Sequence, residues 1–169
     1  MKMKKTLCAV LAAITVMCAF AGCGDSAASS TSDNNSAAAA QTDTTADVSA
    51  IGDKLKSDIT YEDELVEFDD SKITSILGID AAKYSKARVY VGSSGATPEE
   101  IDCFEAVDET AAADIKAVLE KRVESQKTLF EDYKPEQMDK LNDAVIISNG
   151  NYVYLSISND SAKAKEIIG

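Results

Sequence analysis

The chain of 169 residues has no histidine and no tryptophan, and it has only 4 cysteines and 2 prolines. Histidine is the usual general base and a very common metal ligand in proteins. Its absence excludes Ser-His-Asp and Cys-His catalysis, zinc bound by histidine and haem held by histidine. Basic residues are also scarce, with 17 Lys and Arg against 29 Asp and Glu and a net charge of −12. Because binding to a nucleic-acid backbone depends on Lys and Arg, we expect no nucleic-acid partner.

The beginning of the chain has the pattern of a signal peptide. Lys2, Lys4 and Lys5 precede an apolar stretch that covers residues 7–20. This stretch is shorter than the roughly 20 apolar residues that a membrane-spanning helix needs, and it is typical of the apolar part of a secretory signal. We therefore expect residues 1–22 to be a leader for export.

A cysteine preceded by two small residues follows this apolar stretch. The sequence Phe20-Ala21-Gly22-Cys23 resembles the lipobox of bacterial lipoproteins, with phenylalanine where that pattern usually has leucine. The resemblance implies cleavage after Gly22, a diacylglyceryl thioether on Cys23, and attachment to the extracytoplasmic face of the cell membrane. An ordinary leader, cut at Ala19 or Ala21 without lipidation, is the alternative. Two acyl chains are enough for stable membrane anchoring.

The other cysteines fit this interpretation. Cys8 and Cys18 lie in the leader, and Cys23 is used by the lipid. Only Cys103 then remains, so the mature chain has no intramolecular disulfide. An exported domain without disulfides has to be stabilised by packing.

The stretch after the lipobox is of low complexity. Residues 24–46 include no aromatic residue, no Val, Leu or Ile, and no basic residue. Such a segment cannot bury enough apolar surface to offset its conformational entropy. We therefore expect residues 23–46 to be the lipidated cysteine and a flexible tether, which favours the lipid anchor. Residues 47–169 are enough for a single folded domain.

Within residues 47–169, hydrophobic spacing and turn residues predict the order of the elements. They predict a helix capped by Asp47, an edge strand within residues 62–68, a helix capped by Asp70 or Ser71 and ended by Gly78, strands at 87–91 and 101–107, a helix over 108–132, a short helix from Pro135, a C-terminal hairpin, and a last helix capped by Asp160 or Ser161. Short connections between paired strands favour an antiparallel arrangement. The predicted fold class is α+β, with a small antiparallel sheet of about four strands packed with helices.

The hairpin is the clearest local signal. An Asn-Gly pair at residues 149–150 separates two β-rich runs, which is typical of a type I′ turn. A two-residue turn there predicts that Ile147 lies opposite Tyr152 and that Val145 lies opposite Tyr154.

This register places tyrosines together on one face of the sheet. Tyr152 and Tyr154 would share that face with Tyr90 and Arg88, and together they could bind a glycan or a partner strand. The alternative is that helices cover this face. We favour the alternative because the chain has enough helix to cover both sides of the sheet.

Other candidate groups have a structural interpretation that we favour. Cys103 could be a nucleophile, but it alternates with Ile101 in a strand and is expected to be a buried core residue. Residues 93–95, Ser-Ser-Gly, could supply a serine nucleophile or an anion site, but they are typical of a turn. The acidic residues 62–64 and 69–70 could bind calcium, but they lack the spacing of a calcium loop. We expect no metal site and no cofactor.

Two polar residues lie on one face of the long predicted helix. Arg122 and Gln126 are four positions apart and therefore neighbours on the helix surface. Gln126 falls where the apolar stripe would continue, between Val123 and Phe130. We expect it to bind backbone groups of the following loop, and contact with a ligand is the alternative.

The region from about residue 47 to 168 resembles bacterial lipoproteins of the family called domain of unknown function 4358. The resemblance rests on Ser93-Ser94-Gly95, Pro98-Glu99-Glu100-Ile101, Arg122, Gln126, Tyr133-Lys134-Pro135, Gly150-Asn151-Tyr152-Val153 and Leu155. It implies no activity, because the family has none assigned. It does imply a place beside membrane-bound acyltransferases in cell-envelope modification.

The sequence therefore predicts a lipid-anchored, non-enzymatic module outside the cytosol. Its expected role is that of a binding or scaffold protein, which presents its domain to an envelope protein or polysaccharide. The alternative is an accessory factor for acylation of envelope polysaccharide beside a membrane acyltransferase. A hydrolase that uses Ser93 or Ser94 is a third and less favoured interpretation.

Overall fold

The structure is a computed structural model, and it describes residues 47–169. The predictions for the leader, for Cys23 and for the tether lie outside the described residues. None of the helices within 47–169 is both long enough and apolar enough to cross a membrane.

The described part of the chain is an α+β domain, as predicted. Its helices are α1 (Val48–Asp58), α2 (Asp70–Lys72), α3 (Glu109–Tyr133), α4 (Met138–Asn142) and α5 (Ser161–Ile168). Its strands are β1 (Leu65–Glu67), β2 (Tyr84–Gly92), β3 (Glu100–Ala106), β4 (Val145–Asn149) and β5 (Tyr152–Ile157). A π-helix, η1 (Ile73–Leu77), continues α2, and 3-10 turns form η2 (Ala81–Lys83) and η3 (Pro135–Gln137).

All five strands join one antiparallel sheet in the order β1-β2-β3-β5-β4. The sequence predicted about four strands, and β1, with only three residues, is the additional one at the edge. It falls inside the segment that the sequence marked as an edge strand.

Aspartates begin the helices because their carboxylates accept the free backbone N–H groups of the first turn. Asp47 and Asp160 do so for α1 and α5, as predicted, and Asp108 does so for α3. The predicted cap of α2 was wrong. Asp69, not Asp70 or Ser71, accepts the N–H of Lys72, so the helix begins one residue earlier.

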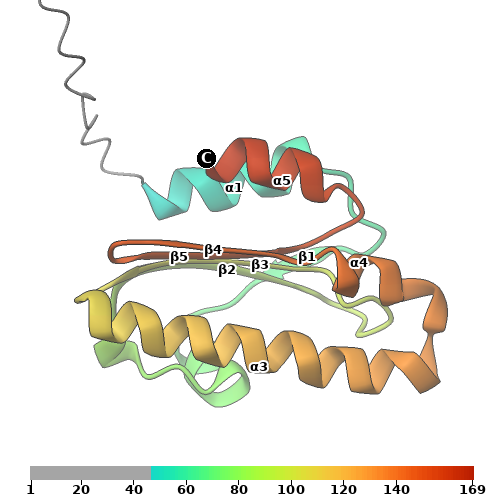
Figure 1. Ribbon diagram of the computed structural model, residues 1–169, viewed down its shortest axis with the longest axis horizontal. Coiled ribbons are helices and arrows are strands. Elements are labelled where there is room, and N and C mark those ends of the chain that lie inside the picture. Colours follow the sequence, from blue (N-terminus) through green and yellow to red (C-terminus); the bar gives the residue numbers. More distant parts are fainter. Residues whose placement is uncertain (1–46) are drawn as a thin grey trace, which may run out of the picture. The chain divides into compact units, whose positions relative to one another are not determined.

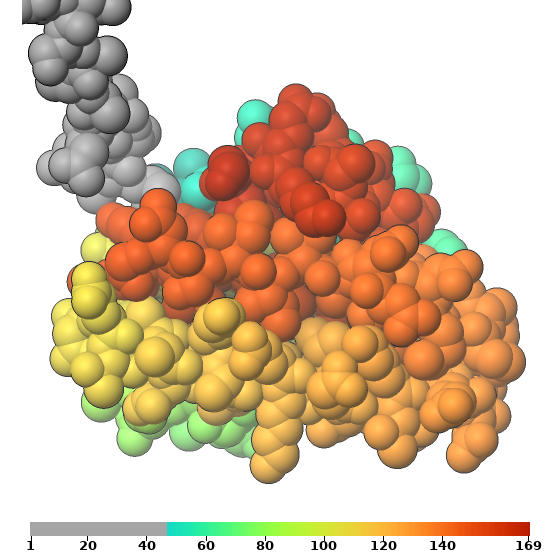
Figure 2. All heavy atoms as spheres, in the orientation of Figure 1, coloured from blue at the N-terminus to red at the C-terminus, as the bar shows by residue number. Residues whose placement is uncertain are grey.

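Helices cover both faces of the sheet (Figure 1). The α2–η1 segment and α3 pack on one face, in a core that includes Phe104 and Leu155. Helices α1 and α5 pack on the other face, in a core that includes Ile101 and Cys103. Figure 2 shows side chains of α5 above the sheet and those of α3 below it.

The predicted register of the hairpin was wrong by two residues. Ile147 lies opposite Tyr154 and Val145 opposite Ser156, so that the turn residues are Gly150 and Asn151. Gly150 has φ +54 and supplies the positive φ that the first turn position of a two-residue hairpin needs. Because a shift of two residues keeps every side chain on its own face, the predicted faces are unchanged.

Candidate functional site

The four residues of the predicted tyrosine face do lie on one side of the sheet. Arg88, Cys103 and Tyr154 occupy neighbouring positions on β2, β3 and β5. Tyr90 is only 6% exposed and Tyr154 only 3%, whereas Arg88 and Tyr152 are half-buried. Helices α1 and α5 cover this side of the sheet, so the open tyrosine surface is not formed. The interpretation that the sequence favoured, a face covered by helices, describes the structure.

A glycine lets α1 approach this face closely. A Cβ atom on Gly52 would lie 2.5 Å from Cγ of Arg88 and 3.5 Å from Sγ of Cys103. The Tyr90 hydroxyl donates a hydrogen bond of 2.7 Å to Asp53 on the same helix. Arg88 also pairs with Asp53, at 3.3 Å, and with Glu67. These polar contacts join α1 to the sheet.

Cys103 is a core residue, as predicted. Its side chain is fully buried, and burial, more than the nearby charge of Asp102, raises the pKa of its thiol. The thiol therefore stays protonated, which is the unreactive form.

Ser93 and Ser94 belong to a turn that is held by an aspartate. The Ser94 hydroxyl donates to Oδ2 of Asp63 at 2.5 Å, and the Ser94 backbone N–H donates to the same oxygen at 2.9 Å. Ser93 donates to Oδ1 at 3.3 Å. Hydrogen bonds from Ser94 lower the pKa of Asp63. These hydrogen bonds therefore hold the loop against the ionised carboxylate of Asp63, which agrees with the interpretation of residues 93–95 as a turn.

The acidic residues near β1 are used inside the fold. Glu62 pairs with Lys140 at 2.9 Å and accepts a hydrogen bond from Gln137. Within residues 47–169, no three Asp, Glu or Cys side chains are grouped so that they could hold a metal ion.

Sequence reasoning missed a set of buried charges at the start of β3. Glu99, Glu100 and Asp102 are each at most 1% exposed. Glu100 and Asp102 alternate with Ile101 and Cys103, a pattern that in a half-exposed sheet places the polar side chains in water. Here helices cover both faces, so these carboxyl groups lie under α3. The sequence did contain one signal of these buried charges: a Glu-x-Asp pair, whose two side chains face the same side of a central strand.

The first of these carboxylates, Glu99, is fully paired. It accepts hydrogen bonds from the backbone N–H groups of Glu62 and Asp63 and from Nζ of Lys140, at 2.7 Å. This cluster connects α4 to β3 and to the loop before β1.

The other two carboxyl groups form a second cluster with Arg122 of α3. Nε of Arg122 donates to Oε1 of Glu100 at 2.5 Å. Oε2 of Glu100 and both carboxyl oxygens of Asp102 are buried and have no hydrogen-bond partner in the described part of the chain. Burial, and then the negative charge of Glu100, raise the pKa of Asp102 well above its usual value. The cluster therefore contains one ion pair and one acid that favours its neutral form.

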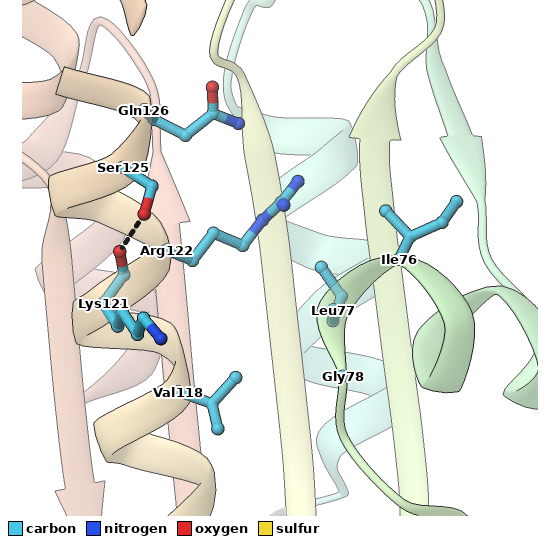
Figure 3. Close-up of a pocket in the computed structure, with 8 residues that line it drawn as sticks. All are labelled: Ile76, Leu77, Gly78, Val118, Lys121, Arg122, Ser125 and Gln126. Atoms are coloured by element: carbon cyan, nitrogen blue, oxygen red, sulfur yellow. Dashed lines mark hydrogen bonds between the residues drawn. The ribbon is translucent and has the colours of Figure 1, made fainter. Parts of the chain in front are cut away.

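Arg122 also lines a groove of about 420 Å³ between α3 and η1. One side is made by Ile76, Leu77 and Gly78, and the other by Val118, Lys121, Arg122, Ser125 and Gln126. Figure 3 shows Val118, Arg122 and Gln126 extending from α3 toward Ile76 and Leu77. The groove thus has an apolar side and a polar side, and a volume typical of ligand sites.

Gln126 lies in this groove. Arg122 and Gln126 do share one face of α3, as predicted. The predicted hydrogen bond from Gln126 to the following loop is not formed, because the Gln126 side chain extends from α3 toward η1. No hydrogen bond of the Gln126 amide is found within residues 47–169, which leaves it available in the groove.

The fold and the groove define a small α+β domain that has one antiparallel sheet between helical layers and a polar groove under its longest helix. The family model described as "Domain of unknown function (DUF4358)" matches residues 57–158, more than half of the chain. The chain therefore belongs to this family, as the resemblance predicted. It has no match among curated proteins or among solved structures.

Proposed function

We propose that this protein is a lipid-anchored, extracytoplasmic binding or scaffold module of the cell envelope, and that its ligand site is the groove between α3 and η1. One observation carries the binding site. In a chain with 29 acidic residues, the groove is lined by two cations, an amide and a hydroxyl and by no acidic residue. Polar donors gathered beside an apolar wall are the usual composition of a ligand site.

A non-catalytic role is supported by the state of the nucleophiles. The thiol of Cys103 is buried and protonated, and the hydroxyl of Ser94 donates a hydrogen bond to Asp63. The pKa of Asp63 is lowered by this contact, so its carboxylate is a weak base for removing the Ser94 proton.

The anchor is supported by the sequence around Cys23, which resembles a lipobox and follows an apolar leader. A coil of the length of residues 24–46 has an end-to-end distance of roughly 25–30 Å. The domain would then stay near the membrane and remain free to turn its groove toward a partner.

The anchor is tested by the variant Cys23→Ser. We expect wild-type protein to carry the diacylglyceryl group and to partition into the detergent phase, and the variant to lack this group, with its leader uncleaved or cut elsewhere. Mass analysis of wild-type material should find the leader removed and Cys23 carrying a diacylglyceryl group. A bare sulfur at Cys23 would contradict the proposal.

The binding site is tested by crosslinking in cells. A photoreactive amino acid replaces Ser125, an exposed residue of the groove, or, as a control, Lys165, an exposed residue of α5 on the other side of the sheet. We expect a defined envelope adduct from position 125 and none from position 165. The same adducts from both positions, or none from position 125, would refute the groove as the site. Recovery of an acyltransferase component would favour the alternative role, an accessory factor in acylation of envelope polysaccharide.

A further inference from the structure

We propose that the groove recognises a ligand with a single carboxylate attached to a branched apolar group. This inference rests on the proposed function, in which the groove is the binding site, and it adds the chemical class of the ligand.

The guanidinium of Arg122 provides the carboxylate site. Its Nε is bonded to Glu100, and no hydrogen bond of its two terminal nitrogens is found in the described part of the chain. Its side chain is 19% exposed and lines the groove. The two terminal N–H groups of a guanidinium match the two oxygens of a carboxylate, and such paired, charge-assisted bonds are stronger than neutral ones.

The buried carboxylate beneath Arg122 positions this guanidinium. Glu100 is fully buried, and its 2.5 Å contact is to Nε, the nitrogen farthest from the tip of the side chain. Holding Arg122 at this nitrogen directs its tip without using the terminal donors. A side chain fixed before the ligand arrives loses less entropy when it binds.

The charges around the groove favour a ligand with one negative charge. Arg122 and Glu100 neutralise each other, and the raised pKa of Asp102 favours its uncharged form. Lys121 then supplies one positive charge, and no acidic residue lines the groove. A phosphate dianion would exceed this charge in a chain whose net charge is −12, so a monoanionic carboxylate is the better match.

The opposite wall selects the apolar part of the ligand. Ile76 is 53% exposed, and it lies beside Leu77 on η1. Val118 of α3 faces them across the groove. A branched aliphatic group placed here would cover Ile76 and remove its exposed surface from water.

The proposal is tested with N-acetyl-leucine, which has both features, and with N-acetyl-leucinamide, which lacks only the charge. Binding is measured by NMR titration of the isotope-labelled mature chain carrying Cys23→Ser. We expect N-acetyl-leucine to shift the resonances of Ile76, Arg122 and Gln126 and to bind at least about tenfold more tightly than the amide. Equal binding of the amide, or tighter binding of inorganic phosphate, would overturn the assignment of a carboxylate.

Two matched variants locate the binding. Ile76→Glu adds a negative charge inside the groove, and Leu129→Glu adds the same charge at a similarly exposed residue of α3 that does not line the groove. We expect at least a tenfold loss of affinity for N-acetyl-leucine in the first variant and a change of less than twofold in the second. Similar losses in both would overturn the proposed position.

Arg122→Lys tests the role of the guanidinium while keeping its charge. A lysine can still pair with Glu100 but has no planar fork, so we expect a clear loss of affinity for N-acetyl-leucine with an unchanged unfolding temperature. Affinity equal to wild type would overturn the proposal. If no probe binds while the crosslinks from position 125 persist, the carboxylate assignment fails and the groove remains the binding site.

Discussion

At the scale of single residues, the unusual feature is the burial of charge on β3. Three buried carboxyl groups, those of Glu99, Glu100 and Asp102, lie at the start of a strand whose two faces are both covered. Two of them are balanced by Lys140 and Arg122. Asp102 has no cation of its own, and it stays buried by favouring its neutral form.

This burial predicts that stability depends on pH. An acid whose pKa is raised on folding binds its proton more tightly in the folded state, so its contribution is complete below its unfolded pKa and is lost as pH rises toward its folded pKa. We expect the free energy of unfolding to fall as pH rises above about 4, the usual pKa of an unfolded aspartate, at a rate of up to about 1.4 kcal/mol per pH unit. The chain has no histidine to mask this change.

The measurement is urea unfolding at several pH values for wild type and for Asp102→Asn. The variant has no proton to lose at this position and should show a flatter profile. Asp132→Asn, which changes an exposed acid of α3, serves as the control and should keep the wild-type slope. A slope unchanged by Asp102→Asn would show that Asp102 is ionised in the folded protein.

At the scale of the elements, the packing of α1 on the sheet depends on a residue that weakens the helix. Glycine in a helix interior costs about 1 kcal/mol relative to alanine. Gly52 is nevertheless buried, because the stem of Arg88 occupies the space where a Cβ atom would lie. Close approach of helix and sheet therefore outweighs helix propensity at this position.

Replacing this glycine should be destabilising. Gly52→Ala gains about 1 kcal/mol of helix propensity, but it places a methyl group 2.5 Å from Cγ of Arg88. Overpacking of this kind costs roughly 1–3 kcal/mol, so we expect a net loss of about 1 kcal/mol in the free energy of unfolding.

The contact itself is tested by a double-mutant cycle. Arg88→Ala removes the Cγ atom, so Gly52→Ala should be less damaging in that background than in wild type. Equal effects in the two backgrounds would mean that crowding by Arg88 is not the reason for glycine at this position.

At the scale of the whole molecule, one buried ion pair joins three parts of the chain. Lys140 of α4 contacts Glu99, next to β3, and Glu62, in the loop before β1. Glu99 also holds that loop through the backbone N–H groups of Glu62 and Asp63. The pair therefore fixes two distant connections at one end of the sheet.

Removing one partner of this pair should be severe. Lys140→Met leaves the carboxylate of Glu99 buried without a cation, and breaking a buried pair in this way costs roughly 3–5 kcal/mol. Chemical unfolding should show this loss. In the double variant Glu99→Gln with Lys140→Met, no buried charge is left at this site, and the loss should be clearly smaller than the sum of the single losses. Additive losses would contradict a direct ion pair.

Local patterns in the sequence predicted the elements well. The caps at Asp47 and Asp160 and the helix end at Gly78 act between residues close in the chain, so each could be inferred from its own neighbourhood. The hairpin register could not be inferred in this way. Gly150 belongs both to a turn at residues 149–150 and to a turn at residues 150–151, and the pairing of β5 with β3 also constrains the register.

The functional residues were less accessible to such reasoning. Arg122 and Gln126 were placed correctly on one face, but their surroundings come from η1, more than 40 positions earlier in the chain. The tyrosine face was assigned to the correct side of the sheet, and its burial depended on how α1 and α5 pack. The alternation of polar and apolar residues on β3 is typical of a strand that has one face in water, whereas α3 covers the polar face of this strand.

The sequence by itself determined the net charge, the exclusion of histidine chemistry, the order of helices and strands, and the antiparallel α+β class. These follow from composition and from interactions between near neighbours. Only the tertiary structure decided that Glu100 lies beneath Arg122, that Asp102 has no cation of its own, and that a groove without acidic residues opens between α3 and η1. The reason is physical: burial, and with it the energy of a charge, is set by segments that are distant in the chain and meet only when the sheet and its helices pack together.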